Sequence, residues 1–550
     1  MAFSARSSSA TYDEVAYLRI ASNWWRTGSE DEITRMGSPL TFWKIQQAPV
    51  FWLLDRAGRG ALIDDSIRKQ SELLPIVRIG SLWIWIVALG LTSWWSRIRY
   101  GPRAMAFSAW LFALSPNLLA HGALITMEMP LVVTTLATIF LFVRFLETVK
   151  LRNFMASAAS CGLAFSCKFT AVLIPVLLGI VWGVDCLRIP IPEKFSLFRL
   201  CKKVTSGMAL YAATMVLADV LVTGGAVLTL SHEPGDSHPS LEGKFAPTAF
   251  TGKLAKWAIE TPIPQDWVGF ATQIRHQSAG GPSYLLGQRR MKGWWYYYFV
   301  AIGVKVPLSL WLLVVSSCVK RYQTARKTGK DPVKALYSRS TTDRDWIFPV
   351  TIALFLLITA LGSSRNYGIR YLLPLAPLSI IWVSRLAEGG TWWRRMAIAG
   401  LVGQGIAVAS VYPHELTYFN VLCGGRTGGR QILADSNLDW GQGLKGLARL
   451  QRERPEIRDL TLYYFGDTLP EYYGVTGVSH TIDAGEVQPD LPVRFDPSTE
   501  FVAVSASLQF GPWGPPGYFR RLEGLIPCAV TDDTTIAVYR RSDLKEGLSQ

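Results

Sequence analysis

Ten apolar runs constrain this chain more than any other feature of its sequence. Several of them approach the ~20 residues that an α-helix needs to cross the hydrocarbon core of a bilayer. Of the 550 residues, 49% are hydrophobic and 12% are aromatic, a composition that excludes an ordinary soluble enzyme. The sequence therefore predicts a polytopic α-helical membrane protein, with apolar runs at about 76–96, 104–120, 130–147, 154–167, 169–185, 207–230, 295–319, 347–362, 371–386 and 396–412.

Basic clusters between these runs predict the topology. Because short loops rich in Lys and Arg stay in the cytoplasm, an even number of spans must separate neighbouring clusters, and the ten runs satisfy this rule. Residues 154–184 are too long for one crossing and start and end on the same side, so we expect a hairpin with Lys168 at its tip. The clusters lie at 96–103, 143–153, 188–203, 320–334 and 385–395.

Three regions follow from this topology. Residues 1–75 are expected to form an outer, interfacial first loop that carries an acidic pair, with helices at about 13–27 and 41–57. Residues 76–412 are expected to form a transmembrane domain of about ten helices, and residues 413–550 a small extracytoplasmic α/β domain. For this last domain the sequence predicts a helix at 437–454 and strands at 460–466, 501–508 and 534–541.

The remaining bulk properties exclude several classes of protein. The net charge of +15 is explained by the membrane topology, so no nucleic-acid partner is expected. The sequence contains no Gly-rich phosphate loop, no zinc-ligand spacing and no nucleophile elbow. Only Cys423 and Cys528 stand where a structural disulfide could form.

The acidic pair Asp13–Glu14 stands near the front of the chain, in SSATYDEVAYLRIASNWW. Thr11-x-x-Glu14 fits a capping box, and two acids in the first turn also complement the helix dipole. A catalytic pair is the alternative. Glu128, in ALITMEMP, precedes Pro130 at the start of an apolar run. It also has two interpretations: an acid that begins a helix, or an acid with a functional role.

Three cations, Lys168, Arg365 and Arg370, are expected on the same outer face, next to hydrocarbon. Each alone is typical of a snorkelling anchor. Three cations that converge with two acidic sites indicate instead a site that binds a phosphate while an acid handles a proton. This arrangement suits transfer from a phosphate-linked lipid, in which a carboxylate takes the proton of an attacking hydroxyl and fixed cations stabilise the departing phosphate.

Six stretches of the sequence resemble the C-type superfamily of membrane glycosyltransferases, within its protein-mannosyltransferase and aminoarabinose-transferase-like group, which depends on phospholipid carriers. They occur in the order expected for that group. The stretches are YDEVAYL (12–18), LLAHGALITMEMPL (118–131), GLAFSCKFTAVLIP (162–175), GWWYYYFVAIGVKVPL (293–308), NYGIRYLLPLAP (366–377) and YFNVLCGG…DSNLDWGQGL (418–444).

The resemblance implies the C-type glycosyltransferase fold and assigns roles to the charged residues. It implies that Asp13 corresponds to the general base, with Glu14 beside it, and that Glu128 corresponds to the second outer-loop acid. Lys168, Arg365 and Arg370 lie where the family contacts lipid phosphate.

Three further assignments come from the same stretches. His121 and Tyr367 are candidate substrate-binding residues. DSNLDWGQ (435–442), which contains Asp439, Trp440 and Gln442, looks like the start of a C-terminal domain found in one bacterial branch.

Two departures from the family pattern stand out. The family's second acid is usually Asp, and the extra methylene of Glu128 shifts its carboxylate by about a bond length. The family also begins with a transmembrane helix before the acidic pair. Either residues 1–75 are translocated as a tail or the true start lies upstream; we expect the latter, because the tail's Arg6, Arg19 and Arg26 resist export.

The sequence thus predicts an inverting glycosyltransferase that moves a sugar from a polyprenyl-phosphate carrier to a hydroxyl acceptor, which is a protein, lipid or glycan, at the outer face of the plasma membrane. Its expected partners are that donor, the acceptor and membrane lipids. The sequence establishes no cofactor, and a requirement for a divalent metal, Mg²⁺ or Mn²⁺, stays open. A polytopic transporter and a catalytically inactive scaffold of the same fold are the rival hypotheses.

Overall fold

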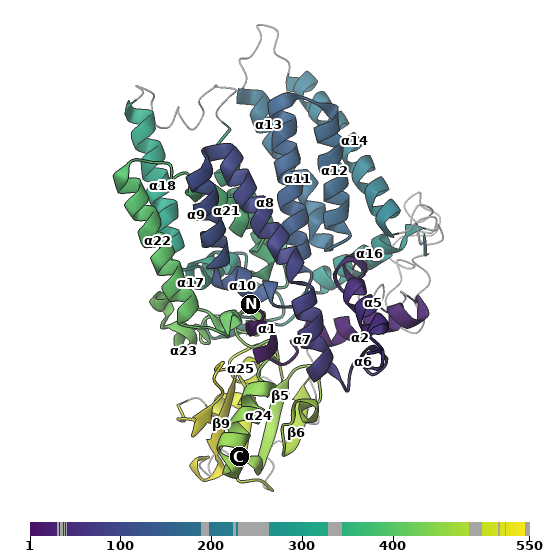
Figure 1. Ribbon diagram of the computed structural model, residues 1–550, viewed down its shortest axis with the longest axis vertical. Helices are drawn as coiled ribbons and strands as arrows, with labels where there is room; N and C mark the ends of the chain where they lie inside the picture. The colour runs from purple at the N-terminus through teal and green to yellow at the C-terminus, as the bar shows by residue number, and fades with distance from the viewer. Residues whose placement is uncertain are drawn as a thin grey trace.

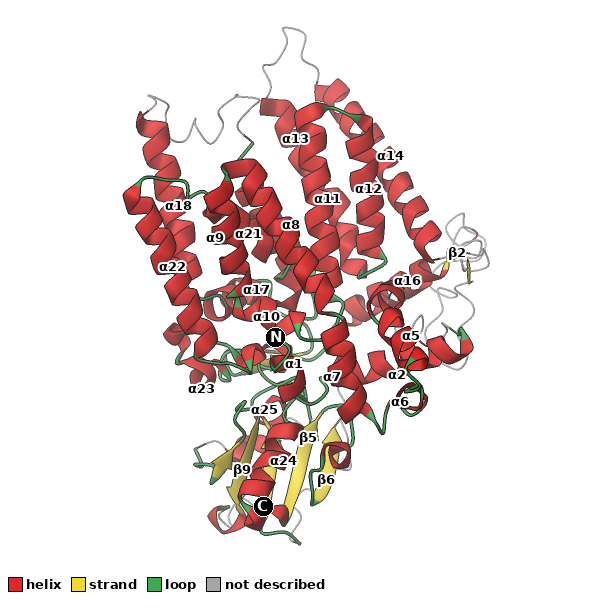
Figure 2. Ribbon diagram, viewed as in Figure 1, coloured by secondary structure: helices red, strands yellow, loops and turns green. Residues whose placement is uncertain are grey.

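A computed structural model shows a bundle of helices, a sheet-containing C-terminal domain at one end of it, and a group of N-terminal helices beside their junction (Figure 1). All of the large sheet lies in the C-terminal domain, as Figure 2 shows by colour. The structure describes residues 1–29, 41–188, 197–223, 263–327, 344–482, 498–514, 518–522 and 524–544, together with residues 32, 37, 39, 227, 228 and 253.

Helices occupy every apolar run expected from the sequence. The expected hairpin is confirmed, because α12 (Leu151–Phe165) is followed by Lys168, the short helix η1 (Phe169–Val172) and α13 (Leu173–Arg188). The other bundle helices are α8 (Leu82–Tyr100), α9 (Pro102–Ala113), α10 (Pro116–Gly122), α11 (Glu128–Thr148), α14 (Leu197–Thr223), α17 (Tyr297–Lys305), α18 (Leu308–Lys327), α20 (Ile347–Gly362), α21 (Leu375–Ser384) and α22 (Thr391–Ala409).

Four helices in the described part of the chain are long and apolar enough to cross a membrane. They are Gln70–Tyr100, Glu128–Thr148, Phe169–Leu187 and Lys202–Thr223, and α17 with α18 makes a fifth if this pair, bent by 104°, counts as one span. Helices such as α12, with 15 residues, rise only about 23 Å, which is less than the ~30 Å of hydrocarbon. The chain is a multi-pass membrane protein, and ten spans stay a prediction.

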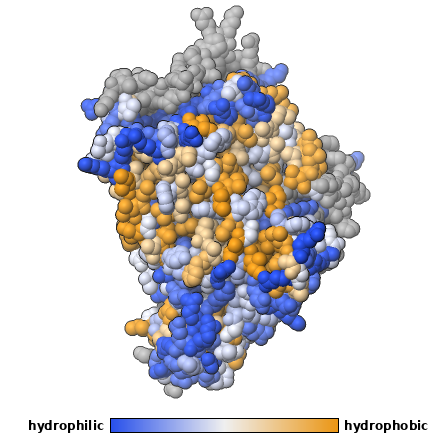
Figure 3. All heavy atoms as spheres, viewed as in Figure 1, coloured by the Kyte–Doolittle hydropathy of each residue, from blue (hydrophilic) through white to orange (hydrophobic). Residues whose placement is uncertain are grey.

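Described residues of four basic clusters, 96–103, 143–153, 320–334 and 385–395, meet at the end of the bundle opposite the C-terminal domain, whereas residues 189–196 and 328–334 lie outside the described part of the chain. Arg99, at the end of α8, pairs with Asp345 at 2.8 Å and with Glu147 at 3.2 Å. Arg385 lies 3.8 Å from Asp345, and its carbonyl accepts a hydrogen bond from Lys320 Nζ at 2.7 Å. Figure 3 shows an apolar belt between two hydrophilic ends, as the charge pattern of the sequence predicts.

The first expected N-terminal helix is confirmed as α2 (Tyr12–Thr27), which begins with the capping box of Thr11 and Glu14. The second is divided into α4 (Thr41–Gln46) and α5 (Ala48–Arg56), because Pro49 enters the first turn of α5 and cannot continue a preceding helix. The remaining N-terminal helices are α1 (Ser4–Ser7), α6 (Ala61–Asp64) and α7 (Gln70–Gly80), which leads directly into α8.

The C-terminal domain is a five-stranded sheet in the order β6-β5-β7-β9-β8. β5 (Leu460–Phe465) pairs in parallel with β6 (Val478–Ile482) and β7 (Phe501–Ser505), whereas β9 (Ile536–Arg540) runs antiparallel to β7 and to β8 (Ala529–Val530). The three expected strands are confirmed as β5, β7 and β9. Residues 506–508 belong to the short helix α25 (Ala506–Gln509) instead of a strand.

The expected helix at 437–454 is shorter than predicted. It forms only as α24 (Leu444–Glu453), because the preceding turn contains Gly441 with a φ of +92°, a conformation that side chains disfavour. One hydrophobic core joins α2 and α7 to this domain and contains Leu18, Val77 and Leu460. Cys423 and Cys528 are both free, so the structure does not form the disulfide that the sequence allowed.

Candidate functional site

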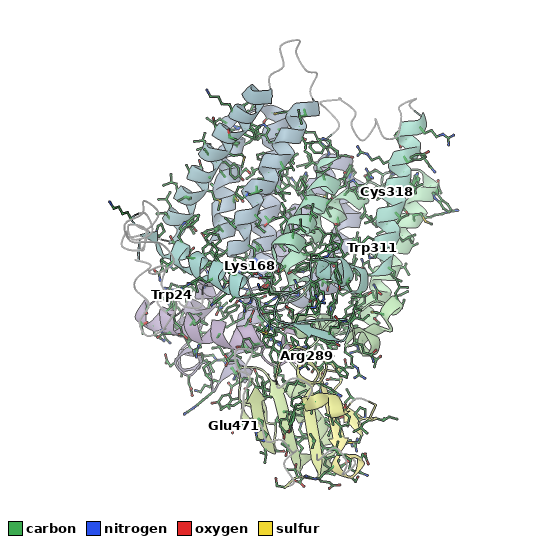
Figure 4. The ribbon with its side chains drawn as sticks, turned by 180° about the vertical axis from the view of Figure 1, so that it is seen from behind. Trp24, Lys168, Arg289, Trp311, Cys318 and Glu471 are labelled. Carbon is green, nitrogen blue, oxygen red and sulfur yellow. The ribbon has the colours of Figure 1, made fainter. Side chains whose placement is uncertain are left out.

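A cavity of about 970 Å³ lies between the helix bundle and the C-terminal domain. Lys168, on its wall, lies at the centre of the molecule, between the long helices and the sheet (Figure 4). One wall is apolar and comes from η1, α13, α16 (Gln265–Ala279) and α20. This wall contains Phe169, Val172, Leu173, Phe270, Ile274 and Ile358.

Charged residues that the sequence singled out line the same cavity. Asp13 begins α2, Glu128 begins α11, Lys168 connects the hairpin, and Arg370 lies in the short helix η2 (Ile369–Leu372). These four elements are far apart in the chain. The fold therefore brings a polar and an apolar surface together in one cavity, which suits an amphiphilic ligand.

Ion pairs connect the four charged side chains. Arg370 Nη1 lies 2.6 Å from Asp13 Oδ2 and 3.8 Å from Glu128 Oε1. Lys168 Nζ donates to Glu128 Oε1 at 2.9 Å. Asp13 has the most exposed side chain of the four, at 22%, whereas Glu128 has only 2%. We name Asp13, Glu128, Lys168 and Arg370 the charged cluster.

The surroundings of Arg370 hold it in its charged form. Its guanidinium lies 4.3 Å from the centre of the Trp440 ring, a cation–π distance. Burial opposes its charge, but Asp13 and Glu128 outweigh that effect and raise the pKa of Arg370 well above its ordinary value. Arg370 is therefore a permanent cation at the cavity wall.

Arg365 and Tyr367 line the same cavity without joining the ion pairs of the charged cluster. Arg365 Nε donates to Tyr367 Oη at 3.0 Å, and its guanidinium lies 4.8 Å from the centre of that ring. Burial raises the pKa of Tyr367, which keeps its hydroxyl protonated. Both residues therefore lie where they can contact a ligand, and their roles in binding stay a prediction.

Glu14 lies outside the cavity wall, and here the structure corrects the expected catalytic role. Its side chain is fully buried and pairs with Arg78, from Nε at 2.9 Å and from Nη2 at 2.5 Å. Thr11 donates to it from its amide and its hydroxyl, both at 3.0 Å, and the amide of Ile125 adds another bond at 3.0 Å. A carboxylate saturated in this way cannot take a proton from substrate, so Glu14 is structural.

His121 is the second correction. It is only 1% exposed and lies behind the cavity wall, with its ring 6.3 Å from that of Trp440. Burial lowers the pKa of His121 to about 3, so this side chain stays neutral. The structure therefore gives no direct route for His121 to contact a ligand in this cavity.

The sequence did not single out Asp435 as a site residue, although the quoted DSNLDWGQ stretch begins with it. Asp435 lines the cavity and is 7% exposed. Burial, together with Asp13, raises the pKa of Asp435 to about 6, although Arg370 counteracts this effect. By contrast, Asp439 caps amides away from the cavity, accepting from Ser507 at 2.8 Å and from Gly441 at 3.0 Å.

No group of three or more His, Cys, Asp or Glu in the described part of the chain has an arrangement that could hold a metal ion. Asp13 and Glu128 are both engaged by cations of the protein itself. The structure therefore neither supports nor excludes the divalent metal that the sequence analysis left open.

Comparison with known proteins bears on this arrangement. Residues 75–200 match the family described as dolichyl-phosphate-mannose-protein mannosyltransferase. This segment includes Glu128 and Lys168. The match confirms the predicted resemblance to carrier-dependent membrane glycosyltransferases and supports a membrane glycosyltransferase with a polyprenyl-phosphate-linked donor.

Two solved structures are similar over all of this chain and 96% of their own. They are ArnT from Cupriavidus metallidurans bound to undecaprenyl phosphate, with 13% identity and a TM-score of 0.45, and the apo state of the same protein, with 13% identity and a TM-score of 0.44. No curated protein matches the sequence.

Proposed function

We propose that this protein transfers a sugar from a polyprenyl-phosphate carrier to a hydroxyl acceptor in the cavity between the bundle and the C-terminal domain. One observation carries the proposal: the charged cluster joins two acids and two cations from four distant segments, in a cavity that apolar side chains also line. Such a cavity matches a donor whose head is a charged phosphosugar and whose tail is hydrocarbon.

The cations bind the donor phosphate. Lys168 and Arg370 each present N–H donors to the cavity, and charge-assisted hydrogen bonds to phosphate are among the stronger polar contacts in proteins. Arg365, on the same wall, adds a third cation. Because negative charge grows on the phosphate as the sugar leaves, these fixed cations stabilise the transition state more than the ground state.

Asp13 acts as the general base. It pairs with Arg370 at 2.6 Å. A donor phosphate that draws hydrogen bonds from Arg370 weakens this pair and makes Asp13 available to the acceptor. The acceptor oxygen then bonds to the anomeric carbon as the bond to the phosphate oxygen breaks, Asp13 takes the hydroxyl proton, and the anomeric configuration inverts.

Glu128 positions the cations. It is almost fully buried and binds Lys168 at 2.9 Å while lying 3.8 Å from Arg370. Its carboxylate therefore sets the separation of the two phosphate-binding groups. We assign it a positioning role instead of proton transfer.

The cavity lies at the end of the bundle next to the C-terminal domain, and the described basic clusters lie at the other end (Figure 1). If the basic end is cytoplasmic, the cavity and the C-terminal domain face outward, and transfer occurs on the extracytoplasmic side of the membrane. A polyprenyl carrier presents its sugar at such an interface.

Donor binding gives a direct test. The purified protein in lipid nanodiscs should bind undecaprenyl phosphate and should release it from a radiolabelled undecaprenyl-phosphate sugar. Arg370→Met should weaken undecaprenyl phosphate binding about tenfold or more, since hydrogen bonds to charged groups contribute about 1.5–3 kcal/mol.

Arg344→Met is the matched control, because Arg344 pairs with Asp185 at 3.2 Å outside the cavity. It should leave the affinity within about twofold, which is below the effect of one lost neutral hydrogen bond. Equal losses in both variants, or no binding by the unaltered protein, would contradict the proposed donor site.

A further inference from the structure

The segment Asp435–Gln442 connects the parts of the molecule that form the cavity. The amide of Tyr12 donates to Trp440 O at 2.7 Å, which fixes the start of α2 next to Asp13. Ser436 Oγ donates to Tyr367 O at 2.5 Å, and Asn437 Oδ1 accepts from the amide of Ile369 at 3.0 Å. The segment therefore holds Asp13 and Arg370 in register, and it belongs to the site instead of merely preceding a separate domain.

Asp435, the first residue of this segment, differs from the other acids of the cavity. Asp13 and Glu128 both form ion pairs, whereas within the described residues no cation lies at ion-pair distance from Asp435 and only the amide of Ser436 hydrogen-bonds to its carboxylate. Its side chain is more than nine-tenths buried and lines the cavity. A buried carboxylate costs free energy unless something hydrogen-bonds to it, so the Asp435 carboxylate favours a ligand that donates hydrogen bonds.

The backbone at Asp435 confirms that its position is strongly determined. Its φ of +58° lies in the left-handed region, which Asp tolerates better than most residues. The Ser436 and Asn437 contacts impose this conformation. The chain thus accepts both a strained backbone and an under-bonded carboxylate at one point of the cavity wall, a combination typical of functional sites.

Aromatic side chains form the adjoining wall. Tyr12 and Phe465 stack with their ring centres 5.6 Å apart and planes at 9°, and Phe465 and Trp513 stack at 5.6 Å and 13°. Tyr367 continues the series, 5.9 Å from Trp513. All four line the cavity, and two of them, Phe465 and Trp513, come from the C-terminal domain. We name these four residues the aromatic row.

We propose that Asp435 and the aromatic row bind the sugar that is transferred, with the Asp435 carboxylate accepting hydrogen bonds from its hydroxyls. This inference rests on the proposed function and names the groups that select its sugar. Asp435 interacts electrostatically with Asp13, the proposed base, and with Arg370 and Arg365, the proposed phosphate-binding groups. The transferred sugar must lie between those two during in-line displacement.

The chemistry of a sugar ring matches both surfaces. Its hydroxyls supply the donors that the Asp435 carboxylate lacks, and hydrogen bonds to a charged acceptor are the stronger kind. Its C–H faces are apolar and pack against aromatic rings, which also exclude water. A site built to bond a particular hydroxyl rejects a sugar that lacks it, because the buried carboxylate is then left unpaired.

The test compares the affinity of the protein for undecaprenyl phosphate with its affinity for the same lipid carrying mannose, glucose or arabinose. For the unaltered protein in nanodiscs, at least one glycosylated lipid should bind about tenfold more tightly than undecaprenyl phosphate, the effect of one or two charged hydrogen bonds. Asp435→Asn and Trp513→Leu should reduce this ratio to about twofold or less, while the affinity for undecaprenyl phosphate itself stays within about threefold.

Asp435→Asn suits this test because Asn keeps the shape of the side chain and tolerates the same backbone angle. Asp533→Asn is the matched control, since Asp533 is a buried acid of the C-terminal domain that lies outside the cavity and accepts hydrogen bonds from Thr531 and Thr535; it should leave the affinity ratio unchanged. A ratio near one in the unaltered protein, or an unchanged ratio in both Asp435→Asn and Trp513→Leu, would overturn this inference alone. Failure of every protein to bind undecaprenyl phosphate would overturn the proposed function as well.

Discussion

Asp13 and Glu14 are neighbours in the chain and have the same charge, yet the fold uses them for opposite purposes. Glu14 is fully buried, bound by Arg78, Thr11 and the amide of Ile125, and it faces away from the cavity. Asp13 lines the cavity, is 22% exposed and has one close cation, Arg370. The first turn of α2 thus carries one acid with a structural role, Glu14, next to one acid that is available to a ligand, Asp13.

The comparison shows how a capping box can support a functional site. Glu14 and Arg78 fix the first turn of α2, and Arg78 also binds the carbonyls of Ala5, Ser8 and Ser9. The rotation of that turn is therefore determined, and a rotation of about 100° per residue directs Asp13 into the cavity. Because the ion pair and hydrogen bonds of Glu14 hold the first turn of α2 in place, the neighbouring Asp13 keeps one orientation.

Replacement of Asp13 by Asn should give the largest effect. The amide cannot accept the acceptor's proton, so transfer from an undecaprenyl-phosphate sugar should fall by about 10²- to 10⁴-fold. Undecaprenyl phosphate binding should persist, because Lys168 and Arg370 remain. The measurement is single-turnover transfer beside equilibrium donor binding; turnover within a few-fold of the unaltered protein would remove Asp13 from the mechanism.

Replacement of Glu14 by Gln should mainly lower the stability of the protein, in contrast to the loss of transfer expected for Asp13→Asn. It leaves Arg78 charged and uncompensated in a fully buried position, and loss of one partner of such a pair costs about 3–5 kcal/mol. The melting temperature in nanodiscs should therefore fall sharply, and a second change, Arg78→Met, should restore part of it. If Glu14→Gln melts normally but loses transfer, Glu14 is catalytic and the proposed division between the two acids is wrong.

The sequence predicted the structural elements around the two acids, but it did not predict which acid is structural and which one lines the cavity. The pattern Thr11-x-x-Glu14 predicted the capping box, and the apolar runs and basic clusters predicted the helices, the hairpin around Lys168 and the common end of the basic loops. What no local pattern contains is the partner of each acid. Arg78 and Arg370 follow Asp13 by 65 and 357 residues, and only the folded chain decides which acid each of them meets.

The C-terminal half of the site was missed for a related reason. The sequence pattern placed most of DSNLDWGQ in the expected helix at 437–454, whereas its role depends on contacts with Tyr12, Tyr367 and Ile369, all distant in sequence. Asp435 stands in it among several polar residues of equal appearance. His121 illustrates the converse, since its place in a conspicuous stretch suggested a ligand contact, whereas packing buries it behind Trp440.

Asp435 offers an intermediate case between Asp13 and Glu14, because it lines the cavity and lacks a close cation. Its pKa is raised to about 6 by burial, so the folded state binds a proton more tightly than the unfolded chain does. Ionised Asp435 therefore destabilises the fold above about pH 6, and this cost disappears as the pH falls toward the ordinary Asp value of about 3.9.

Asp435→Asn should accordingly raise the melting temperature at pH 7.5, by the equivalent of at most about 3 kcal/mol, and should raise it little at pH 4. The pH dependence of melting for both proteins, recorded without any ligand, measures this directly. Arg370, Asp13 and Arg365 are the charged groups that face Asp435, and all three stay in place in the variant. A variant less stable than the unaltered protein at pH 7.5 would mean that the carboxylate has a structural partner.

The smallest expected effect tests whether the cap itself orients Asp13. Thr11→Val removes the hydroxyl that donates to Glu14 Oε2 at 3.0 Å but preserves the buried volume. Because the Thr11 amide and Arg78 still hold Glu14, the free energy of unfolding should fall by only about 1 kcal/mol, the usual value of an N-cap. Transfer should fall only a few-fold, since α2 keeps its direction. Thr11→Ser, which keeps the hydroxyl, should retain more activity than Thr11→Val; the reverse order would show that methyl packing, and not the cap, sets the position of Asp13.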